Sequence, residues 1–331
     1  MSAQTKRVSR RVTAADVARS LGLSRATVGF VLNSTPGQSI SEATKRRVLD
    51  EAQQLGYRPH TAARALASGR SRIVLLVLPD WPLGHSMRAN IDEASLTLDR
   101  AGYSLVTTSP HPDGQAVPLW ESLNPDVVLS LTPLPDDHYA AIASSGAIAL
   151  VPDRGSLEFE QNQLFADGSR VQVEHLLAQG RRRIVFAGPD DQRLAGLAEQ
   201  RRQVAAATLR DRADADLVAV ATVNAGNARD SVRGWVVAGA DSVVAYNDDV
   251  AAIVVAAALR QGIAIPDQLA IVGHDDTPLA SLLVPAVSSV RVDAAGLGRY
   301  LALVAVAAVE GGTPPSAGPS AEVQLVRRET T

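Results

Sequence analysis

The sequence predicts an α + α/β protein: a three-helix helix-turn-helix head at residues 1–58, a hinge helix and linker at 59–72, and a body at 73–331 made of two doubly wound parallel-sheet lobes. Three observations predict this organisation. At 331 residues, the chain is longer than a single hydrophobic core usually organises. Basic residues gather near the beginning of the chain, and two series of apolar runs alternate with helical stretches after it.

The charge of the chain is segregated along its length. Residues 1–72 hold thirteen Lys and Arg against four Asp and Glu, whereas residues 73–331 hold nineteen against thirty-one. This asymmetry is typical of a basic nucleic-acid-binding head on an acidic body. A solvated basic tail is the alternative, but the head is patterned as well as charged.

Capping residues mark the first two helices of the head. Thr13 followed by Asp16 is an N-terminal capping signal, and Gly22 ends the helix that begins there. Ser24 is the N-cap of a second helix, whose apolar positions have the spacing of one inward face: Val28, Val31 and Leu32. Two short helices joined by a tight glycine turn form a helix-turn-helix.

A third helix is predicted from Ser41 and Glu42 up to Gly56. Its apolar positions are expected to pack inward against the other two helices; they are Val48, Ala52 and Leu55.

The outward face of the second helix is the candidate base-reading surface. Its positions are Arg25, Ala26, Gly29, Phe30 and Asn33. A glycine lets the edge of DNA come close, Phe30 can contact thymine methyl groups, and Arg25 can donate two hydrogen bonds to guanine. Ser24, Thr27 and Asn33 are short polar residues that suit phosphates. The alternative is that Phe30 packs into the core of the head.

The segment RPHTAARALASGRS, residues 58–71, is too short to hold a helix alone in water. We expect it to fold against a partner and DNA, with Leu66 as a wedge in a minor-groove step. The alternative is a plain linker with Leu66 packed on the body.

Two series of four apolar runs predict the strands of the body. The first series is 73–78, 103–108, 126–131 and 147–151, and the second is 183–188, 217–222, 242–247 and 269–273. Helical stretches such as 86–100 lie between them. Strand–helix alternation that occurs twice indicates two doubly wound parallel sheets.

Open parallel sheets bind ligands beyond the carboxyl ends of their strands. In the first lobe this rule nominates Pro79, Asp80, Trp81, Thr132, Asp153 and Arg154. In the second lobe it nominates Asn247, Asp248, His274, Asp275 and Asp276. Two alternatives stay open: Trp81 as ordinary packing of the lobe, and Asp275 as the cap of a helix that begins near Thr277.

Motifs of catalysis and cofactor binding are missing. The chain has no cysteine, no Walker loop, no GxGxxG after a strand, no HExxH and no GxSxG, so we expect neither an enzyme nor a cofactor or metal. The run HDD at 274–276 lacks a second group of ligands. No apolar stretch is long enough for a membrane span and no export signal precedes the head, which predicts a cytoplasmic protein without a membrane partner.

Two runs in the head carry a resemblance to a known family. VTAADVARSLGLSRATVGFVLN and SEATKRRVLDEAQQLGYRPHTAARALASGRS resemble the lactose repressor-like (LacI/GalR) transcription regulators. The resemblance implies a homodimer on a palindromic operator of double-stranded DNA, with paired hinge helices opening the minor groove. It implies backbone contacts from Ser24, Thr27 and Asn33, base contacts from Arg25 and Ala26, and intercalation of Leu66. The remaining expected DNA contacts are Thr13, Gly29, Phe30, Tyr57, His60 and Ala63.

Looser motifs extend the resemblance to the body. DGSRVQVEHLLAQGRRRIVFAGP, RLAGL, VVAYNDDVAAIVVAAALRQGIAIPDQLAIVGHDDTPLA and VQLVRRETT resemble the family's periplasmic-binding-protein-like core, in which small ligands lie between two lobes. The resemblance implies hydrogen bonds to a hydroxyl-rich effector from Arg193, Asn247 and Asp275, and crossing strands near 162–166, 288–292 and 320. With Trp81, Thr132 and Asp153 these form the candidate effector site; a surface role is the alternative for Arg193.

Three departures from the family pattern concern specificity. The chain has TVGF at 27–30 where the family usually has TVSR, so its DNA half-site is expected to differ. WPLGHSM at 81–87 and Ala294 depart near the effector, whose identity the sequence therefore does not predict.

The sequence thus predicts a DNA-binding transcription regulator, a repressor, whose operator affinity is modulated by a small molecule, expected to be a sugar. One rival is a DNA-binding regulator whose cleft binds no effector. The other is a solute-binding protein, which would need an export signal and no head. The C-terminal tail lacks a leucine heptad, so a dimer is expected rather than a coiled-coil tetramer.

Overall fold

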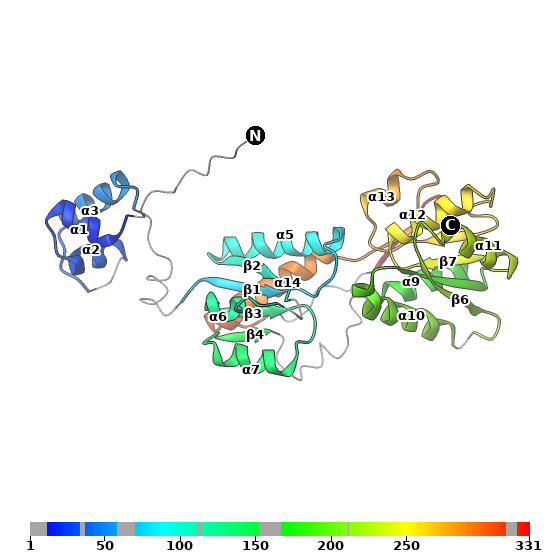
Figure 1. The fold of residues 1–331 in the computed structure, drawn as a ribbon, viewed down its shortest axis with the longest axis horizontal. Helices are drawn as coiled ribbons and strands as arrows, with labels where there is room; N and C mark the ends of the chain where they lie inside the picture. Colours follow the sequence, from blue (N-terminus) through cyan, green and yellow to red (C-terminus); the bar gives the residue numbers. More distant parts are fainter. Residues whose placement is uncertain are drawn as a thin grey trace. The chain divides into compact units, whose positions relative to one another are not determined.

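The chain consists of two compact units, which are described separately. The computed structural model describes residues 12–33, 37–57, 70–110, 114–151, 167–210, 212–315 and 323–331. The units are Met1–Arg72 and Ile73–Thr331 (Figure 1). The predicted hinge helix falls mostly on residues 58–69, which lie outside the described residues.

The first unit contains the three predicted helices: α1 (Ala14–Leu21), α2 (Arg25–Leu32) and α3 (Glu42–Gln54). Thr13 and Asp16 form a reciprocal capping box at the start of α1, and Gly22 ends α1 with a φ of 63°. The Ser24 hydroxyl accepts a hydrogen bond from the backbone N–H of Thr27, 3.0 Å away, at the start of α2. The capping residues therefore act where the sequence predicts.

Each helix of the head contributes two residues to a small core. Its fully buried members are Val17, Ala18, Val28, Val31, Val48 and Ala52. The prediction that Leu55 packs inward is wrong, because α3 ends at Gln54 and Leu55 is the C-cap, 38% exposed.

The first lobe of the second unit is a four-stranded parallel sheet in the order β2-β1-β3-β4. Its strands are β1 (Ile73–Val77), β2 (Ser104–Thr108), β3 (Val127–Ser130) and β4 (Ala149–Val151). One face is covered by α5 (His85–Arg100) and α14 (Ala294–Glu310), which pack on Val74, Leu76 and Leu129. The other face packs with α6 (Leu119–Ser122) and α7 (Asp136–Ser144) through Trp120 and Ile142.

The second lobe repeats this plan with the strand order β6-β5-β7-β8, again parallel. Its elements are β5 (Arg183–Pro189), β6 (Asp216–Val223), β7 (Ser242–Ala245), β8 (Ala270–Val272), α9 (Gly168–Ala178), η2 (Gln192–Leu194), α10 (Ala195–Leu209), α11 (Ala228–Val237), α12 (Asp248–Leu259) and α13 (Pro278–Leu282). All eight predicted strands are confirmed. They could be predicted because buried parallel strands are apolar on both faces and therefore form continuous apolar runs in the sequence.

The chain passes between the lobes late in the sequence. Helix α14 packs in the first lobe, although the elements just before it belong to the second. Strand β9 (Ser289–Arg291) pairs antiparallel with β10 (Gln324–Val326), and Thr330 then hydrogen-bonds Ile271 in the second lobe. The strand predicted at 288–292 is confirmed. Residues 162–166 and 320 lie outside the described residues.

Close packing between α5 and α14 leads to a stability prediction. A Cβ atom on Gly298 would lie 2.1 Å from the backbone oxygen of Asn90. Gly298→Ala is therefore expected to lower the free energy of unfolding by about 3 kcal/mol, measured by urea denaturation.

The matched control is Gly234→Ala in α11, where a Cβ would meet nothing within 4 Å. It is expected to raise stability by up to about 1 kcal/mol through helix propensity. Equal stabilities of the two variants would contradict close packing at Gly298.

Candidate functional site

The outward face of α2 is arranged as the sequence predicts. Arg25, Ala26 and Asn33 are exposed, and Gly29 is half-buried. Phe30 is 37% exposed and is not among the residues packed on the head's core, so the alternative that it fills this core is wrong. An aromatic ring, a guanidinium and a glycine thus share one surface of a short helix.

The other predicted DNA-contacting residues of the head surround this face or support it. The hydroxyls of Ser24 and Thr27 lie 2.9 Å apart at the N-terminus of α2. The hydroxyl and the backbone N–H of Thr13 donate to Asp16, and these hydrogen bonds, together with Arg19, lower the pKa of Asp16 to about 2. Tyr57 packs against the core of the head. The DNA contacts of these residues stay predictions, and His60, Ala63 and Leu66 lie outside the described residues.

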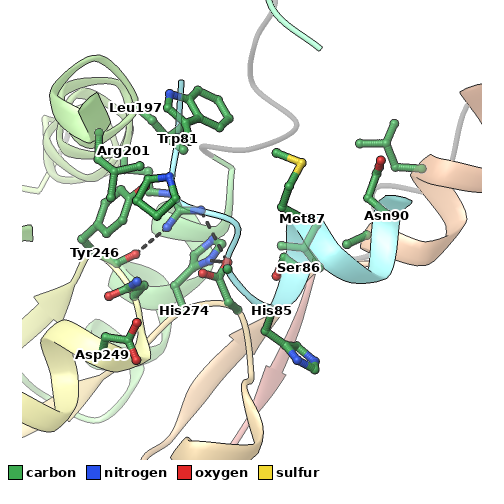
Figure 2. A pocket seen from close by; sticks show the side chains of 18 of the residues that line it. Trp81, His85, Ser86, Met87, Asn90, Leu197, Arg201, Tyr246, Asp249 and His274 are labelled. Carbon is green, nitrogen blue, oxygen red and sulfur yellow. Dashed lines mark hydrogen bonds and ion pairs between the residues drawn. The ribbon is translucent and has the colours of Figure 1, made fainter. Parts of the chain in front are cut away.

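A cavity in the second unit is lined by residues of both lobes. Figure 2 shows side chains that line it, and its volume is about 210 Å³. In the first lobe, the wall comes from the segments that follow β1 and β3; in the second lobe, it comes from those that follow β5, β7 and β8. In both sheets the strand order reverses at the central pair, β1 with β3 and β5 with β7, and such switch points leave a crevice beyond the strand ends.

The structure brings only some of the predicted effector residues to this cavity. Trp81, Asn247, Asp275 and the nominated His274 line it. Trp81 also packs against the core of the second lobe, and its role in effector binding stays a prediction. Asp153 and the nominated Arg154 lie outside the described residues.

Two predicted effector residues do not line the cavity. Arg193 forms an ion pair with Asp191 at 2.6 Å and lies 3.9 Å from Asp80, and its side chain is 47% exposed. Thr132 follows β3, and its carbonyl oxygen accepts a hydrogen bond from Ser130. The roles of both in effector binding stay predictions, without support from the geometry.

Sequence reasoning missed Arg201, which is 4% exposed and lines the cavity. Its guanidinium lies over the ring of Tyr246, 4.5 Å from the centroid, and donates to the Tyr246 carbonyl oxygen. Its Nη2 is 3.6 Å from Oδ1 of Asp275. A signal was present: the buried positions of α10 have a four-residue spacing and include this arginine, namely Leu197, Arg201, Ala205 and Leu209.

Asp275 contacts His274 and Arg201 and does not cap a helix. Its Oδ1 lies 2.8 Å from Nδ1 of the fully buried His274. The alternative that Asp275 caps the next helix is wrong, because α13 begins after Thr277, whose backbone N–H is bound by Asp248 at 2.6 Å. The φ of Asp275 is 90°, a strained conformation of the kind that clusters at functional sites.

Charges and burial set the protonation of this pair. Burial lowers the pKa of His274, and the nearby Arg201 lowers it further, so the ring is neutral and donates from Nδ1. Burial opposes ionisation of Asp275, but His274 and Arg201 outweigh it and hold the pKa of Asp275 well below its usual range. Asp275 is therefore an ionised hydrogen-bond acceptor at neutral pH.

Asp248 is buried behind the cavity and is expected to make stability depend on pH. It accepts hydrogen bonds from Thr277 and Ser289, yet burial raises its pKa from 3.8 to about 6. The folded chain then binds this proton more readily than the unfolded chain does, so the contribution of Asp248 to stability falls as pH rises from about 4 through about 6.

Comparison with Asp248→Asn isolates this effect. The pKa shifts of the other carboxyl groups contribute equally to the stability of both chains and cancel in the difference. The free energy of unfolding of the wild-type chain relative to the variant should decrease by about 2–3 kcal/mol between about pH 4 and 7. Urea denaturation across this range measures it. A difference that does not change with pH would refute the raised pKa.

Two structural absences concern the described residues. Within them, no group of three His, Cys, Asp or Glu residues is placed to hold a metal ion. In this part of the chain, no helix combines the length and apolar character needed to cross a bilayer.

Two parts of the chain match known protein families. Residues 13–60, which include α1, α2 and α3, match the lacI family of bacterial regulatory proteins. The head of this chain is therefore similar to the lacI family. Residues 173–331 match the periplasmic binding protein-like domain, which covers most of the second lobe and the crossing segments.

Relatives of this chain align over nearly its whole length. The ribose operon repressor of Halalkalibacterium halodurans is 28% identical and aligned over 96% of this chain and 97% of its own. The HTH-type transcriptional regulator GntR of Pseudomonas aeruginosa is 27% identical over 98% and 97% of the two chains. These relatives are transcription regulators.

Solved structures share the fold. The lac repressor dimer bound to operator and an anti-inducer has a TM-score of 0.75 and 22% identity, with 97% of this chain and 99% of the other covered. The transcriptional regulator CelR in complex with cellobiose has a TM-score of 0.62 and 23% identity, with 97% and 100% covered.

Proposed function

We propose that this chain is a cytoplasmic transcriptional repressor that binds a palindromic operator as a homodimer and responds to a sugar in the cavity. The observation that carries the proposal is the coexistence, in one chain whose head matches the lacI family, of an exposed face on α2 and a two-lobed cavity that contains an ionised acceptor. The division at 1–58, 59–72 and 73–331, including Leu66 as a minor-groove wedge, is part of the proposal. No catalytic role is proposed.

The chemistry of the cavity suits a hydroxyl-rich ring. Asp275 presents an ionised carboxylate, and charge-assisted hydrogen bonds to such a group are stronger than neutral ones. Trp81 and Tyr246 supply aromatic surface against which the apolar face of a sugar ring packs. A repressor of a ribose operon among the relatives, and cellobiose in a structural neighbour, support this class of effector.

The cavity also supports allosteric control. Its wall comes from both lobes, so a bound sugar stabilises the lobe arrangement that lets both walls contact it. An effector changes operator affinity only to the extent that it binds the DNA-competent and incompetent arrangements differently. The experiment below determines whether the sugar strengthens or weakens operator binding.

Selection of bound duplexes from a random pool tests the proposal. The purified full chain is used with and without a set of sugars, and thermal unfolding is followed in parallel. We expect a palindromic consensus whose recovery changes with at least one sugar, and a sugar at 100 times its Kd should add about 2.7 kcal/mol to stability. No enrichment in any condition would refute DNA-sequence recognition; a consensus with no response to any sugar would refute the effector.

A further inference from the structure

We propose that Arg201 is the positioning and specificity-determining residue of the cavity, because it holds Asp275 as a fixed acceptor. The site then selects a ligand rich in hydroxyl or amine donors over the corresponding ligand in which a hydroxyl group is replaced by a carboxylate. This inference rests on the proposed effector function. It adds the residue that organises the site and the charge class of the ligand.

Arg201 is fixed on three sides. Its guanidinium lies over the Tyr246 ring and donates to the Tyr246 backbone oxygen (Figure 2). It also faces Asp275, whose Oδ1 lies 3.6 Å from Nη2 of Arg201. These contacts tie α10 to the segments that follow β7 and β8. Since the guanidinium is planar and always charged, its position also fixes the position of the Asp275 carboxylate.

Stability alone does not account for a charge at this place. Arg201 occupies the inward stripe of α10 between Leu197 and Ala205, where an apolar side chain would fill the same space. Burial of an ion pair costs desolvation, and replacement by well-packed apolar residues is often neutral or stabilising. The charge therefore serves the cavity, which Arg201 lines, rather than the core.

The polar groups at this end of the cavity are mainly acceptors. Asp275 is ionised, and the exposed Asp249 lies on the same wall at the start of α12. Among the described residues that line the cavity, Arg201 is the one arginine or lysine, and its donors are engaged by Tyr246 and Asp275. A ligand carboxylate placed here meets like charge, whereas hydroxyl or amine groups meet acceptors.

Four groups act on Asp275 and Arg201 from neighbouring elements. His274 hydrogen-bonds Asp275, Tyr246 stacks on Arg201, Asp248 lies behind the pair, and Asp249 is on the cavity wall. His274 has an ordinary pKa near neutrality, but its burial keeps it uncharged, and Asp248, whose pKa is raised to about 6, is ionised above about pH 7. Binding of a neutral sugar to the wild-type chain should therefore be almost independent of pH between about 7 and 8.

The first test measures the ligand class in the wild-type chain. Isothermal titration calorimetry compares glucose with glucuronate and galactose with galacturonate, with ribose and cellobiose as further neutral probes. Each neutral sugar is expected to bind about 10-fold or more tightly than its acid. The neutral sugar donates a hydroxyl group to Asp275, whereas the carboxylate of the acid cannot donate and meets like charge. A uronate that binds as tightly as its parent sugar overturns the inference but leaves an effector function standing. If no probe of either class binds, the proposed effector function fails, and this inference with it.

The second test measures positioning, with the neutral sugar that binds most tightly. Arg201→Met keeps the apolar stem but removes the guanidinium, so the pKa of Asp275 should rise and the sugar affinity should fall about 10-fold, with a further loss as pH decreases below about 6. Arg201→Lys should restore part of the affinity and the pH profile of the wild type. The neighbouring Arg202 pairs with Glu199 on the surface, and Arg202→Met should match the wild type. A pH profile of Arg201→Met that matches the wild type, with only a lower melting temperature, would assign Arg201 a purely structural role.

Discussion

Replacement of Phe30 by alanine is expected to weaken binding to the selected operator by about 10- to 100-fold, because loss of one base-pair contact typically costs about 1–3 kcal/mol. Binding to random duplex DNA should hardly change, since it depends on phosphate contacts from basic and polar groups. The fold of the head should persist, because Phe30 lies outside its core. Fluorescence anisotropy with the selected operator and a scrambled duplex at one salt concentration measures both affinities.

Leu49 provides the matched control for this prediction. It is another large apolar residue on the surface of the head, 52% exposed, but it lies on α3 rather than on the outward face of α2. Leu49→Ala should therefore leave operator preference unchanged. If Phe30→Ala weakened operator and scrambled DNA equally, Phe30 would position the head rather than read bases.

The second large effect is expected from Asp275→Asn. Sugar binding should weaken by about 100-fold, because the variant loses a charge-assisted acceptor and leaves Arg201 buried without its carboxylate partner. Operator binding without sugar should remain, since Asp275 belongs to the second unit. Calorimetry measures the sugar affinity, and anisotropy measures the response of operator binding to the sugar.

Arg193→Met tests whether Arg193 binds the effector, as the family resemblance implies, or only pairs with Asp191, as in the structure. The family resemblance implies that Arg193 binds the effector, whereas in the structure it pairs with Asp191 and does not line the cavity. We expect this variant to change sugar affinity by less than about threefold, the effect of a solvent-exposed ion pair. A loss as large as that in Asp275→Asn would show that Arg193 reaches the bound ligand.

Local interactions explain why much of the fold could be predicted. Thr13, Ser24 and Ser41 act as helix caps, because a side-chain oxygen meets a backbone N–H only three residues away. The eight strands of the lobes were predicted because both faces of a parallel sheet are buried. The prediction that Leu55 packs inward was wrong because it lies at the end of α3. The residue at which a helix ends depends on the geometry of its last turn, and the apolar spacing does not reveal it.

Contacts between distant segments explain what could not be predicted at the cavity. Trp81, Asn247 and Asp275 were nominated because each follows a strand, and this position depends on the chain order alone. Arg201 was missed because it lies inside a helix, and only the packing of α10 beside Tyr246 and Asp275 turns it into a cavity residue. Arg193 was favoured from a motif, but its partner Asp191 is two residues away and holds it at the surface.

The sequence by itself determined the three helices of the head, the two parallel-sheet lobes and the strand ends at which a ligand cavity forms. These features depend on short-range capping and on periodic burial, which can be read along the chain. Only the tertiary structure decided which cation faces Asp275, because the guanidinium of Arg201 and this carboxylate are separated by more than seventy residues and meet through the packing of α10 on the segments after β7 and β8. The charge state of the site follows from that contact.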